Sequence, residues 1–512
     1  MFASTYGSTV QGVDAKTIRI EVNVTQGQGI WMSGLPDTAI KESAHRIESA
    51  LKSTGYFVPR NKVIINLAPA DIRKEGSAYD LPIALCMLKA SDQLNTEILD
   101  NFLIMGELSL EGNLRPIKGA LPIAIQASNE KFKGFILPKA NAMEAAIVEG
   151  ITVLGVDSLH DANEFLEGEL EIDPVKIHVD ELFAEKMNHY DSDFKDVQGQ
   201  ENIKRALEIA AAGGHNVIMI GPPGAGKTML AKRLPTILPP MTISEALETT
   251  KVHSVAGKLG SDAKLLTTRP FRNPHCTISD IALVGGGGNP QPGEISLSHN
   301  GVLFLDELPE FKRAALEVMR QPMEERKVTI SRARVSIDYP ANFMLIASMN
   351  PCPCGYHNHP EKDCVCAPGI VQRYLSRISG PLLDRIDLHV EVVPVSFEEM
   401  MVHKQVETSE VIRSRVVKAR QIQSARFREF EGVYCNAMMP SNMVKSICSI
   451  QPTAIKLLRT AMERLGLSAR AYDRILKVSR TIADLAGSKD IQVEHLAEAI
   501  QYRSLDREGW AG

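Results

Sequence analysis

The order of apolar and polar positions divides the chain into three blocks. In the first block, residues 1–168, runs such as "KTIRIEVNV" and "KVIINLAP" are typical of strands, and "DLPIALCMLKA" has helical spacing. A charged, mostly polar stretch follows at residues 169–189, which we expect to be a linker. Residues 190–395 again alternate strand-like and helical patterns, and residues 396–512 are helical by period. The pattern predicts a multidomain α/β protein with a helical C-terminal domain.

Three apolar runs in the second block are the clearest strands of the chain: "HNVIMIG", "GVLFLDE" and "NFMLIASMN". The first leads into a glycine-rich loop and a helical pattern, which is the context of a phosphate-binding loop. Its glycines allow backbone N–H groups to surround phosphates. We expect ATP to bind along Gly221, Pro222, Pro223, Gly224, Ala225, Gly226, Lys227, Thr228 and Met229. In this motif Lys227 reaches the β- and γ-phosphates, and Thr228 is a ligand of Mg²⁺.

The other two runs end in polar residues that complete a hydrolytic site. Asp306 and Glu307 follow "VLFL", and a carboxylate pair at a buried strand end is costly unless a cation lies there. We expect Asp306 to hold Mg²⁺ and Glu307 to orient and deprotonate the attacking water. Asn350 ends the third run, where its amide can contact the γ-phosphate or the water. An exposed acidic turn and a strand-end asparagine are the simpler alternatives.

Three segments together resemble the magnesium-chelatase-like AAA+ ATPases, and in particular the YifB/ComM group. They are "DFKDVQGQENIKRALEIAAAGGHNVIMIGPPGAGKT", "FRNPHCTISDIALVGGGGNPQPGEISLSHNGVLFLDELPEF" and "ASMNPCPCGY". The resemblance covers nearly the whole chain. It implies a hexameric ring with ATP sites between subunits, and the competence member of the group is a DNA branch-migration helicase. This chain has Cys276 where the family usually has a second histidine after His275.

The resemblance also assigns two arginines and a nucleotide-flanking segment. "PLLDRIDLHV" matches the segment of the arginine finger, which makes Arg385 the candidate to reach a neighbouring subunit's ATP. "GLSARAYDRIL" matches the second sensor motif, which makes Arg470 the candidate in the helical lid. Arginine suits both roles because its planar fork pairs with phosphate oxygens, although either residue can instead form a structural ion pair. The segment near Val197 is expected beside the adenine.

The first block resembles the Lon-protease-like fold through "PADIRKEGSAYDLPIALCML" and "MGELSLEGNLRPIKGALPIAIQA". A Lon-type protease needs a serine activated by a lysine. When these segments are aligned without gaps to the Lon-type motif, Ala78 takes the position of the nucleophile and Leu121 that of the base. Ser77 and Lys118 lie close by but out of register. We therefore expect a non-proteolytic scaffold without an in-register Ser/Lys dyad.

Basic residues gather in three segments that we consider for DNA contact. A long Gly/Pro-rich insertion carries Arg269, Arg272 and His275. A hairpin-like pattern at residues 324–340 is expected to expose Arg326, Lys327, Arg332 and Arg334. A helical pattern that can form either an intersubunit face or a DNA-contacting face carries Arg413, Arg415, Lys418, Arg420, Arg426 and Arg428. In a ring pore such cations can track phosphates without reading sequence, but ordinary solvated charges are the alternative in each case.

Half of the eight cysteines lie in one short stretch after Asn350. Cys352, Cys354, Cys364 and Cys366 offer four soft ligands, a set that suits tetrahedral Zn²⁺. His357 or His359 can replace one ligand, and free thiols are the alternative. We expect the other four, Cys86, Cys276, Cys435 and Cys448, to be packing residues.

The composition narrows the class of protein without choosing a substrate. The chain has 512 residues, 44% hydrophobic and 23% charged, with a net charge of −5, so it does not attract nucleic acid as a whole. No apolar run approaches a membrane span, the start has no secretory pattern, and few cysteines favour the cytoplasm. The leading hypothesis is an ATP-driven hexameric ring that remodels single-stranded or branched DNA. A chelatase-type or chaperone-like ATPase acting on a protein, and an ATP-dependent protease, are the alternatives.

Overall fold

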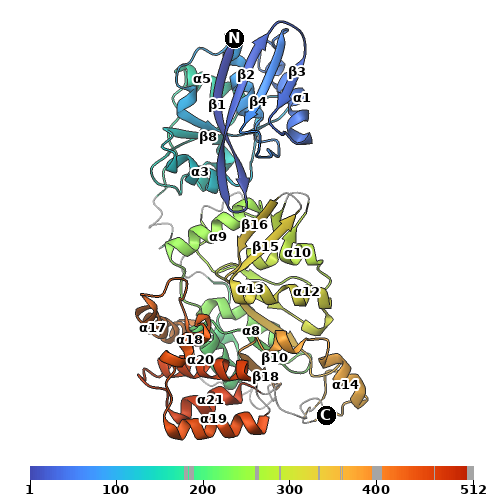
Figure 1. Cartoon of the computed structure of the whole chain (residues 1–512), viewed down its shortest axis with the longest axis vertical. Helices are drawn as coiled ribbons and strands as arrows, with labels where there is room; N and C mark the ends of the chain where they lie inside the picture. The colour runs from blue at the N-terminus through green and yellow to red at the C-terminus, as the bar shows by residue number, and fades with distance from the viewer. Residues whose placement is uncertain are drawn as a thin grey trace. The chain divides into compact units, whose positions relative to one another are not determined.

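The computed structural model describes residues 1–177, 183, 190–259, 265–287, 290–332, 335–357, 359, 361–394, 406–465 and 468–503 (Figure 1). The chain forms two compact units. Unit 1 comprises Met1–Lys186, Ile243–Leu266 and Ser331–Tyr339, and unit 2 comprises Met187–Thr242, Thr267–Ile330 and Pro340–Gly512. Both mix helices and strands, so the predicted multidomain α/β class is confirmed. Within the described ranges, no helix has the length and apolarity needed to cross a membrane.

Unit 1 is built on a seven-stranded sheet in the order β3-β4-β2-β1-β5-β8-β9. β1 and β2 pair antiparallel, as do β2 and β4, while the remaining neighbours are parallel. The strands are β1 (Phe2–Gln11), β2 (Asp14–Thr25), β3 (Ile30–Ser33), β4 (Lys62–Ala68), β5 (Phe102–Ile104), β8 (Gly134–Pro138) and β9 (Thr152–Val156). The predicted alternation is real, because Ile18, Ile20 and Val22 of β2 are all fully buried.

Helices cover this sheet and complete its core. They are α1 (Thr38–Ser53), α2 (Asp80–Ala90), α3 (Ala120–Asn129), α4 (Lys139–Ala145) and α5 (Leu159–Glu167), with a small ribbon of β6 (Glu107–Leu108) and β7 (Leu114–Arg115). α2 and α3 both pack on β1 and β2. α2 is apolar along almost its whole length, as a helix buried between a sheet and α1 must be.

A helix from the middle of the sequence belongs to unit 1. α9 (Ile243–Val255) packs on α3, and Ser254 donates its hydroxyl to the buried carboxylate of Glu144. The backbone N–H of Gly119 donates to the Ser254 carbonyl at 3.3 Å. Burial raises the pKa of Glu144, although the hydrogen bond from the Ser254 hydroxyl opposes the shift. A contiguous division at residues 168 and 190 does not capture this packing, and the proposed domain boundaries stay a prediction.

Unit 2 contains a five-stranded sheet in the order β11-β14-β17-β10-β18, and every neighbouring pair is parallel. The strands are β10 (Val217–Ile220), β11 (Phe271–Arg272), β14 (Val302–Leu305), β17 (Met344–Met349) and β18 (Leu388–Glu391). The three predicted strands are therefore β10, β14 and β17, which lie side by side. All their residues are buried, which explains why they read as continuous apolar runs.

The remaining elements of unit 2 include short helices and small two-stranded sheets around this core. The helices are α7 (Glu201–Gly213), α8 (Lys227–Arg233), α10 (Asp280–Val284), α11 (Glu294–Leu297), α12 (Arg313–Val318), α13 (Arg320–Glu325), α14 (Pro368–Leu375) and α15 (Gly380–Leu383). The extra strands of unit 2 are β12 (Gly285–Gly286) and β13 (Gln291–Pro292), and β15 (Lys327–Arg332) begins in this unit. β16 (Val335–Pro340) belongs to the Ser331–Tyr339 segment of unit 1 except for Pro340. β15 and β16 pair as the hairpin that the sequence predicts.

The C-terminal part of unit 2 is helical, as its period predicts (Figure 1). It comprises α17 (Ser409–Phe427), α18 (Ser441–Ile447), α19 (Pro452–Leu465), α20 (Ala469–Leu485) and α21 (Val493–Gln501). α17 and α20 pack against α7, and their apolar residues join one core with the strands. The helices and the sheet therefore share a single hydrophobic core.

A buried carboxylate ties the start of two strands to α20. Asp387, just before β18, is fully buried and accepts from Arg474 at 2.9 Å, from the Asn216 backbone N–H at 3.2 Å and from His215 Nδ1 at 3.1 Å. Burial alone would raise the pKa of Asp387, but Arg474 and His215 hold it well below the ordinary range. Burial lowers the pKa of His215. The carboxylate therefore stays charged at the junction of sheet and helix.

We predict that Asp387→Ala lowers the free energy of unfolding by about 3–5 kcal/mol, because Arg474 and His215 lose their shared partner inside the protein. The check is the urea midpoint of both variants followed by circular dichroism. Asp384→Ala is the matched control, since Asp384 faces the 64% exposed Arg470 at 3.5 Å and such exposed pairs contribute below about 1 kcal/mol. Equal midpoints for the two variants would contradict this account.

Candidate functional site

The loop between β10 and α8 has the shape of a phosphate cradle. Gly224 and Gly226 have φ of 81° and 84°, in the left-handed region that glycine adopts without strain. Gly221 is needed for another reason, because a Cβ there would lie 2.3 Å from the Val392 carbonyl oxygen. α8 begins at Lys227 directly after the loop. The predicted strand, loop and helix are thus all in place.

Lys227 is buried within this loop and makes three hydrogen bonds. Its ammonium donates to the carbonyls of Gly221 at 2.6 Å and Pro222 at 3.0 Å, and to Asn350 Oδ1 at 3.1 Å. Burial lowers the pKa of Lys227, while the carboxylates of Asp306 and Glu307 act in the opposite direction. The ammonium lies at the point where the loop meets the ends of β14 and β17.

Thr228 and Asp306 provide adjacent oxygen atoms suited to a hard cation. The Thr228 hydroxyl donates to Asp306 Oδ2 at 2.7 Å, and Asp306 Oδ1 accepts from the backbone N–H of Glu307 at 3.1 Å. Hydroxyl and carboxylate oxygens are the ligands that Mg²⁺ prefers, so this pair fits the ion that the sequence predicts. Glu307 is exposed and has φ of 55°, so its carboxylate is open to solvent.

Ser348 is a residue of this cluster that the sequence reasoning missed. Its hydroxyl donates to Asp306 Oδ1, and the Glu307 backbone N–H points to its oxygen at 3.4 Å. Ser348 and Asn350 are two residues apart at the end of β17, and period-two alternation puts them on one face. The two-residue spacing from Asn350 is the sequence signal that could have identified Ser348 as a site residue. The structure therefore brings together Lys227, Thr228, Asp306, Ser348 and Asn350.

Other residues predicted to flank the nucleotide are more dispersed. Met229 is partly exposed, and Val197 is buried in the core of unit 2. Gln200, which sequence reasoning also missed, donates from Nε2 to the carbonyl of Ala225 in the phosphate loop at 2.9 Å. Arg470 is 64% exposed, and its ion-pair partner among the described residues is Asp384, at 3.5 Å. Its predicted role as second sensor stays a prediction.

Arg385, the arginine-finger candidate, is held within its own subunit. Its side chain is 9% exposed and pairs with Glu324 at 2.6 Å, and it donates to the Pro381 carbonyl at 2.6 Å. It lines a cavity of about 410 Å³ together with residues of α12 and α13. A role toward a neighbouring subunit requires Arg385 to leave Glu324, and that role stays a prediction.

The Lon-like positions of unit 1 hold no serine–lysine pair. Leu121 is fully buried, and Ala78 packs against the hydrophobic core. The hydroxyl of Ser77 donates to Glu107 and makes no hydrogen bond to Lys118, which is exposed. These contacts agree with the expected scaffold, and its lack of proteolytic activity stays a prediction.

Most of the arginines considered for DNA contact are bound inside unit 2. Arg269 donates to the carbonyls of Pro239 and Asn300 at 2.7 Å each, and Arg272 makes a bidentate pair with Glu294 at 2.6 and 2.7 Å. Only His275 of this set is exposed. The two arginines thus fix the insertion to the sheet edge.

The expectation of an exposed Arg326 is wrong. Arg326 directly follows α13 with a left-handed φ of 57°, and its side chain donates to the Phe343 carbonyl at 3.0 Å. Burial lowers the pKa of this guanidinium. Lys327 is exposed. Arg334 and the side chain of Arg332 lie outside the described residues.

The basic helix α17 is also largely committed to its own subunit. Arg413 donates to the Thr236 carbonyl, and Arg420 to that of Ala211. The acidic partners of the other two inward arginines are Glu208 and Glu407 for Arg415, and Asp484 for Arg426. Lys418 and Arg428 are exposed. The basic pattern of this helix mainly reflects packing against α7 and α20.

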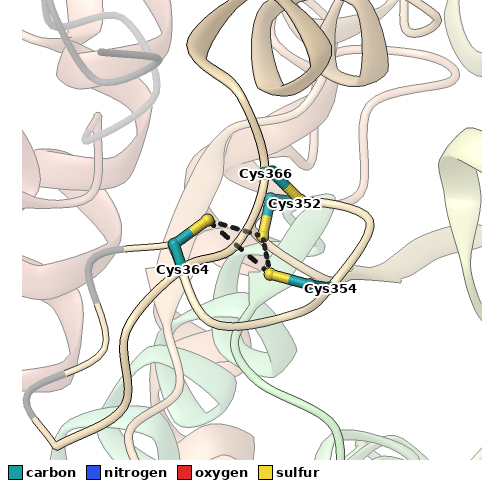
Figure 2. Close-up of side chains that lie close together, drawn as sticks. All are labelled: Cys352, Cys354, Cys364 and Cys366. Carbon is teal, nitrogen blue, oxygen red and sulfur yellow. Dashed lines mark hydrogen bonds between the residues drawn. The ribbon is translucent and has the colours of Figure 1, made fainter.

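The four clustered cysteines meet at one point, as Figure 2 shows. Their sulfur atoms all lie within 4.8 Å of one another, and three separations are 3.3 Å (Cys352–Cys354), 3.7 Å (Cys352–Cys364) and 3.6 Å (Cys354–Cys364). Cys366 completes the group, and all four are free thiols. Among the described residues the group contains no histidine; His359 Nδ1 instead accepts the N–H groups of Glu361 and Lys362.

Comparison with known proteins gives three matching family models. "Magnesium chelatase, subunit ChlI" matches residues 193–400, "Subunit ChlI of Mg-chelatase" matches residues 20–141, and "Magnesium chelatase, subunit ChlI C-terminal" matches residues 406–503. The matches therefore cover parts of the N-terminal block, the phosphate-loop region and the C-terminal helices.

Similar curated proteins span almost the full length. The chain is 44% identical over 501 residues to "Uncharacterized protein YifB" of Escherichia coli, covering 97% of this chain and 96% of that protein. It is 43% identical over 508 residues to "Competence protein ComM" of Haemophilus influenzae, covering 99% and 98%. A partial match to "Lon protease 2" of Bacillus subtilis is 31% identical over 174 residues, covering 31% and 30%.

We predict that Lys227→Ala weakens ATP binding and lowers ATP turnover by about 10²- to 10³-fold, because a charge directed at the phosphates is lost. Fluorescent nucleotide binding and steady-state phosphate release check both effects. Lys232→Ala is the matched control, since Lys232 is an exposed lysine of the same helix. Similar ATP turnover for both variants would show that Lys227 does not belong to the ATP site.

Proposed function

The chain belongs to the magnesium-chelatase-like AAA+ ATPases of the YifB and ComM type, and on that basis we propose that it hydrolyses ATP to remodel DNA. The observation that carries the ATPase part is the meeting of Lys227, Thr228, Asp306 and Asn350 at one edge of the parallel sheet. No other cluster in the described part of unit 2 combines a phosphate loop, a cation pair and a neighbouring amide.

In the proposed reaction each residue has a separate task. The loop from Gly221 to Thr228 binds the phosphates, and Thr228 and Asp306 would hold Mg²⁺, which neutralises phosphate charge. The exposed carboxylate of Glu307 takes the proton of the attacking water. Asn350 donates its amide N–H to the γ-phosphate or positions the water while its Oδ1 remains on Lys227. The products are ADP and phosphate.

We further propose a hexameric ring in which a neighbour supplies Arg385. In this proposal, the 2.6 Å ion pair between Arg385 and Glu324 is the state of a subunit whose Arg385 does not contact a neighbour's ATP. Exchange of Glu324 for phosphate oxygens keeps the guanidinium paired and stabilises charge in the transition state. Arg470 would act on the same nucleotide from the helical lid.

DNA is the substrate we propose, in single-stranded or branched form, with branch migration in recombination as the reaction. The support is the full-length similarity to a competence protein and the sequence resemblance to that group.

We also propose that Zn²⁺ is the ion bound by the four clustered cysteines. We propose the cytoplasm as the location, because all eight cysteines are free and free cysteines are typical of a reducing compartment.

A protein partner, as for a chelatase-type or chaperone-like ATPase, is the second candidate. The observation that favours it is the internal pairing of most candidate DNA-binding arginines, including Arg269, Arg272 and Arg326. Such residues cannot also contact phosphates unless the subunit rearranges.

DNA-stimulated ATP turnover separates the two candidates. We predict that four-way-junction or single-stranded DNA raises the turnover of the purified chain with Mg²⁺, and that added salt reduces this stimulation. Glu307→Gln is the control for contaminating ATPases, because loss of the base lowers hydrolysis by about 10²- to 10⁴-fold while ATP still binds. Turnover that is indifferent to every DNA would turn the search to a protein partner.

Mixing of two inactive variants tests the shared site. Arg385→Gln should lower turnover by about 10³-fold or more if the arginine acts on the γ-phosphate. Mixed rings of Arg385→Gln and Lys227→Ala subunits should regain activity, because some interfaces then combine an intact loop with an intact arginine. If co-assembled subunits regain none, Arg385 does not act between subunits.

A further inference from the structure

The four cysteines after β17 form a site whose geometry matches one tetrahedral ion. Zn–S bonds of about 2.3 Å place thiolates of a tetrahedron about 3.8 Å apart. The separations among Cys352, Cys354 and Cys364, which are 3.3, 3.7 and 3.6 Å, are close to this value and far above the bonded distance of about 2.05 Å in a disulfide. Figure 2 shows the sulfur atoms of Cys352, Cys354 and Cys364 facing one another, and the sulfur of Cys366 lies within 4.8 Å of all three.

The segment that carries these cysteines has little else to hold it. Between the end of β17 at Met349 and the start of α14 at Pro368, the described residues form no helix or strand. Its internal backbone bonds are isolated turns, such as Gly355 N–H to the Cys352 carbonyl at 3.0 Å. Loops of this length without secondary structure need a cross-link or a function to stay ordered. Four thiolates on one ion supply such a cross-link.

The cysteine loop lies directly against the phosphate loop. A Cβ at Gly355 would lie 2.5 Å from Cδ and 3.1 Å from Cγ of Pro223, so the Gly355 backbone approaches the Pro223 ring as closely as glycine permits. Gly355 is buried and has φ of 85°. The neighbouring Gly221 N–H donates to the Met349 carbonyl at 3.2 Å. Displacement of the cysteine loop therefore disturbs the nucleotide side of the sheet.

Asn350 is anchored from both ends of the cysteine loop. On one side it precedes Cys352, which is fully buried. On the other side α14 begins shortly after Cys366 and carries Tyr374, whose side chain is buried and lies close enough to the Asn350 backbone for that backbone to lower the pKa of its hydroxyl, although burial raises this pKa overall. The amide of Asn350 accepts from Lys227 at 3.1 Å. An ion that joins the two cysteine pairs therefore fixes both chain segments that position this amide.

We propose that Cys352, Cys354, Cys364 and Cys366 bind one Zn²⁺ and that this ion holds Asn350 in place, so that cleavage of ATP depends on the metal more than binding of ATP does. The inference deepens the proposed function and rests on its ATPase part. Cleavage is the sensitive step because Asn350 is the one group of this loop at the γ-phosphate position. The β-phosphate contacts come from residues 221–228.

The first experiment compares metal content, nucleotide affinity and turnover in the full-length protein. Wild type should hold one Zn²⁺ per chain by elemental analysis. The Cys364→Ser/Cys366→Ser double variant should lose it and lower kcat by about 10- to 100-fold, the range seen when groups that orient an active site are removed. Its affinity for a fluorescent ADP analogue should change by less than about threefold, a shift below 1 kcal/mol. Cys276→Ser is the metal-content control, because Cys276 lies outside the cluster.

A second measurement does not depend on the folding of a variant. Wild-type protein stripped with a mercurial reagent and a chelator should lose turnover and regain it when Zn²⁺ is returned. Co²⁺ in place of Zn²⁺ should give the visible spectrum of a tetrahedral tetrathiolate site. Folded wild-type protein without bound metal, or with iron as the bound ion, overturns the zinc assignment.

Gly355 offers a test of the coupling that leaves all four ligands in place. Gly355→Ala should keep Zn²⁺ and lower kcat, because the new Cβ pushes against Pro223. Gly432→Ala is the matched control, since Gly432 has a similar φ of 78° and no atom within 4 Å of its added Cβ. The coupling is overturned if the wild type binds Zn²⁺ but its kcat does not change when the metal is removed. It is also overturned if the two glycine variants have equal kcat.

These outcomes also separate this inference from the proposed function. Wild-type protein that holds Zn²⁺ but never hydrolyses ATP, with or without DNA, refutes the ATPase proposal and the coupling while the metal site stands. Hydrolysis that persists at full rate in metal-free protein refutes the coupling while the ATPase proposal stands.

Discussion

The parallel register of β14, β17 and β10 is the constraint on which the candidate site depends. Because Leu305 pairs with Ala347 and Ile220 pairs with Met349, the three strands end at one edge of the sheet. Asp306, Asn350 and the phosphate loop follow these ends directly. The ammonium of Lys227 then meets the amide of Asn350, and Thr228 meets Asp306, without any long-range adjustment of the backbone. Chemistry at this edge is a consequence of strand pairing in a buried sheet.

The sequence was informative where a local pattern carries the structure. The run "HNVIMIGPPGAGKT" predicts a strand, a turn and a helix because Gly224 and Gly226 adopt a left-handed φ without strain, and Gly221 leaves room for the Val392 carbonyl. Buried strands need continuous apolar residues, so β10, β14 and β17 were readable as well. The clustering of four cysteines was visible from spacing alone. These features depend on neighbours along the chain, which a sequence displays.

The sequence was uninformative where a side chain's partner lies far along the chain. Arg326 looked like a hairpin cation, yet it directly follows α13 with a left-handed φ and donates to the Phe343 carbonyl. The arginines of α17 looked like an exposed basic face, but Arg426 pairs with Asp484 and Arg415 with Glu208. The packing of α9 in unit 1 also has no local signal. Positive charge in a sequence does not reveal whether an acid or a carbonyl already compensates it.

Three regions of unit 2 take part in the proposed hydrolysis: the strand ends, the cysteine loop and the helical lid. The central proposal is that the strand-end cluster cleaves the γ-phosphate of ATP. Single-turnover cleavage of radiolabelled ATP by an excess of purified protein tests it most directly, because neither product release nor a missing partner can hide the chemical step. We predict Mg²⁺-dependent formation of ADP and phosphate on the enzyme. Tightly bound ATP that remains intact with Mg²⁺ present would contradict the claim.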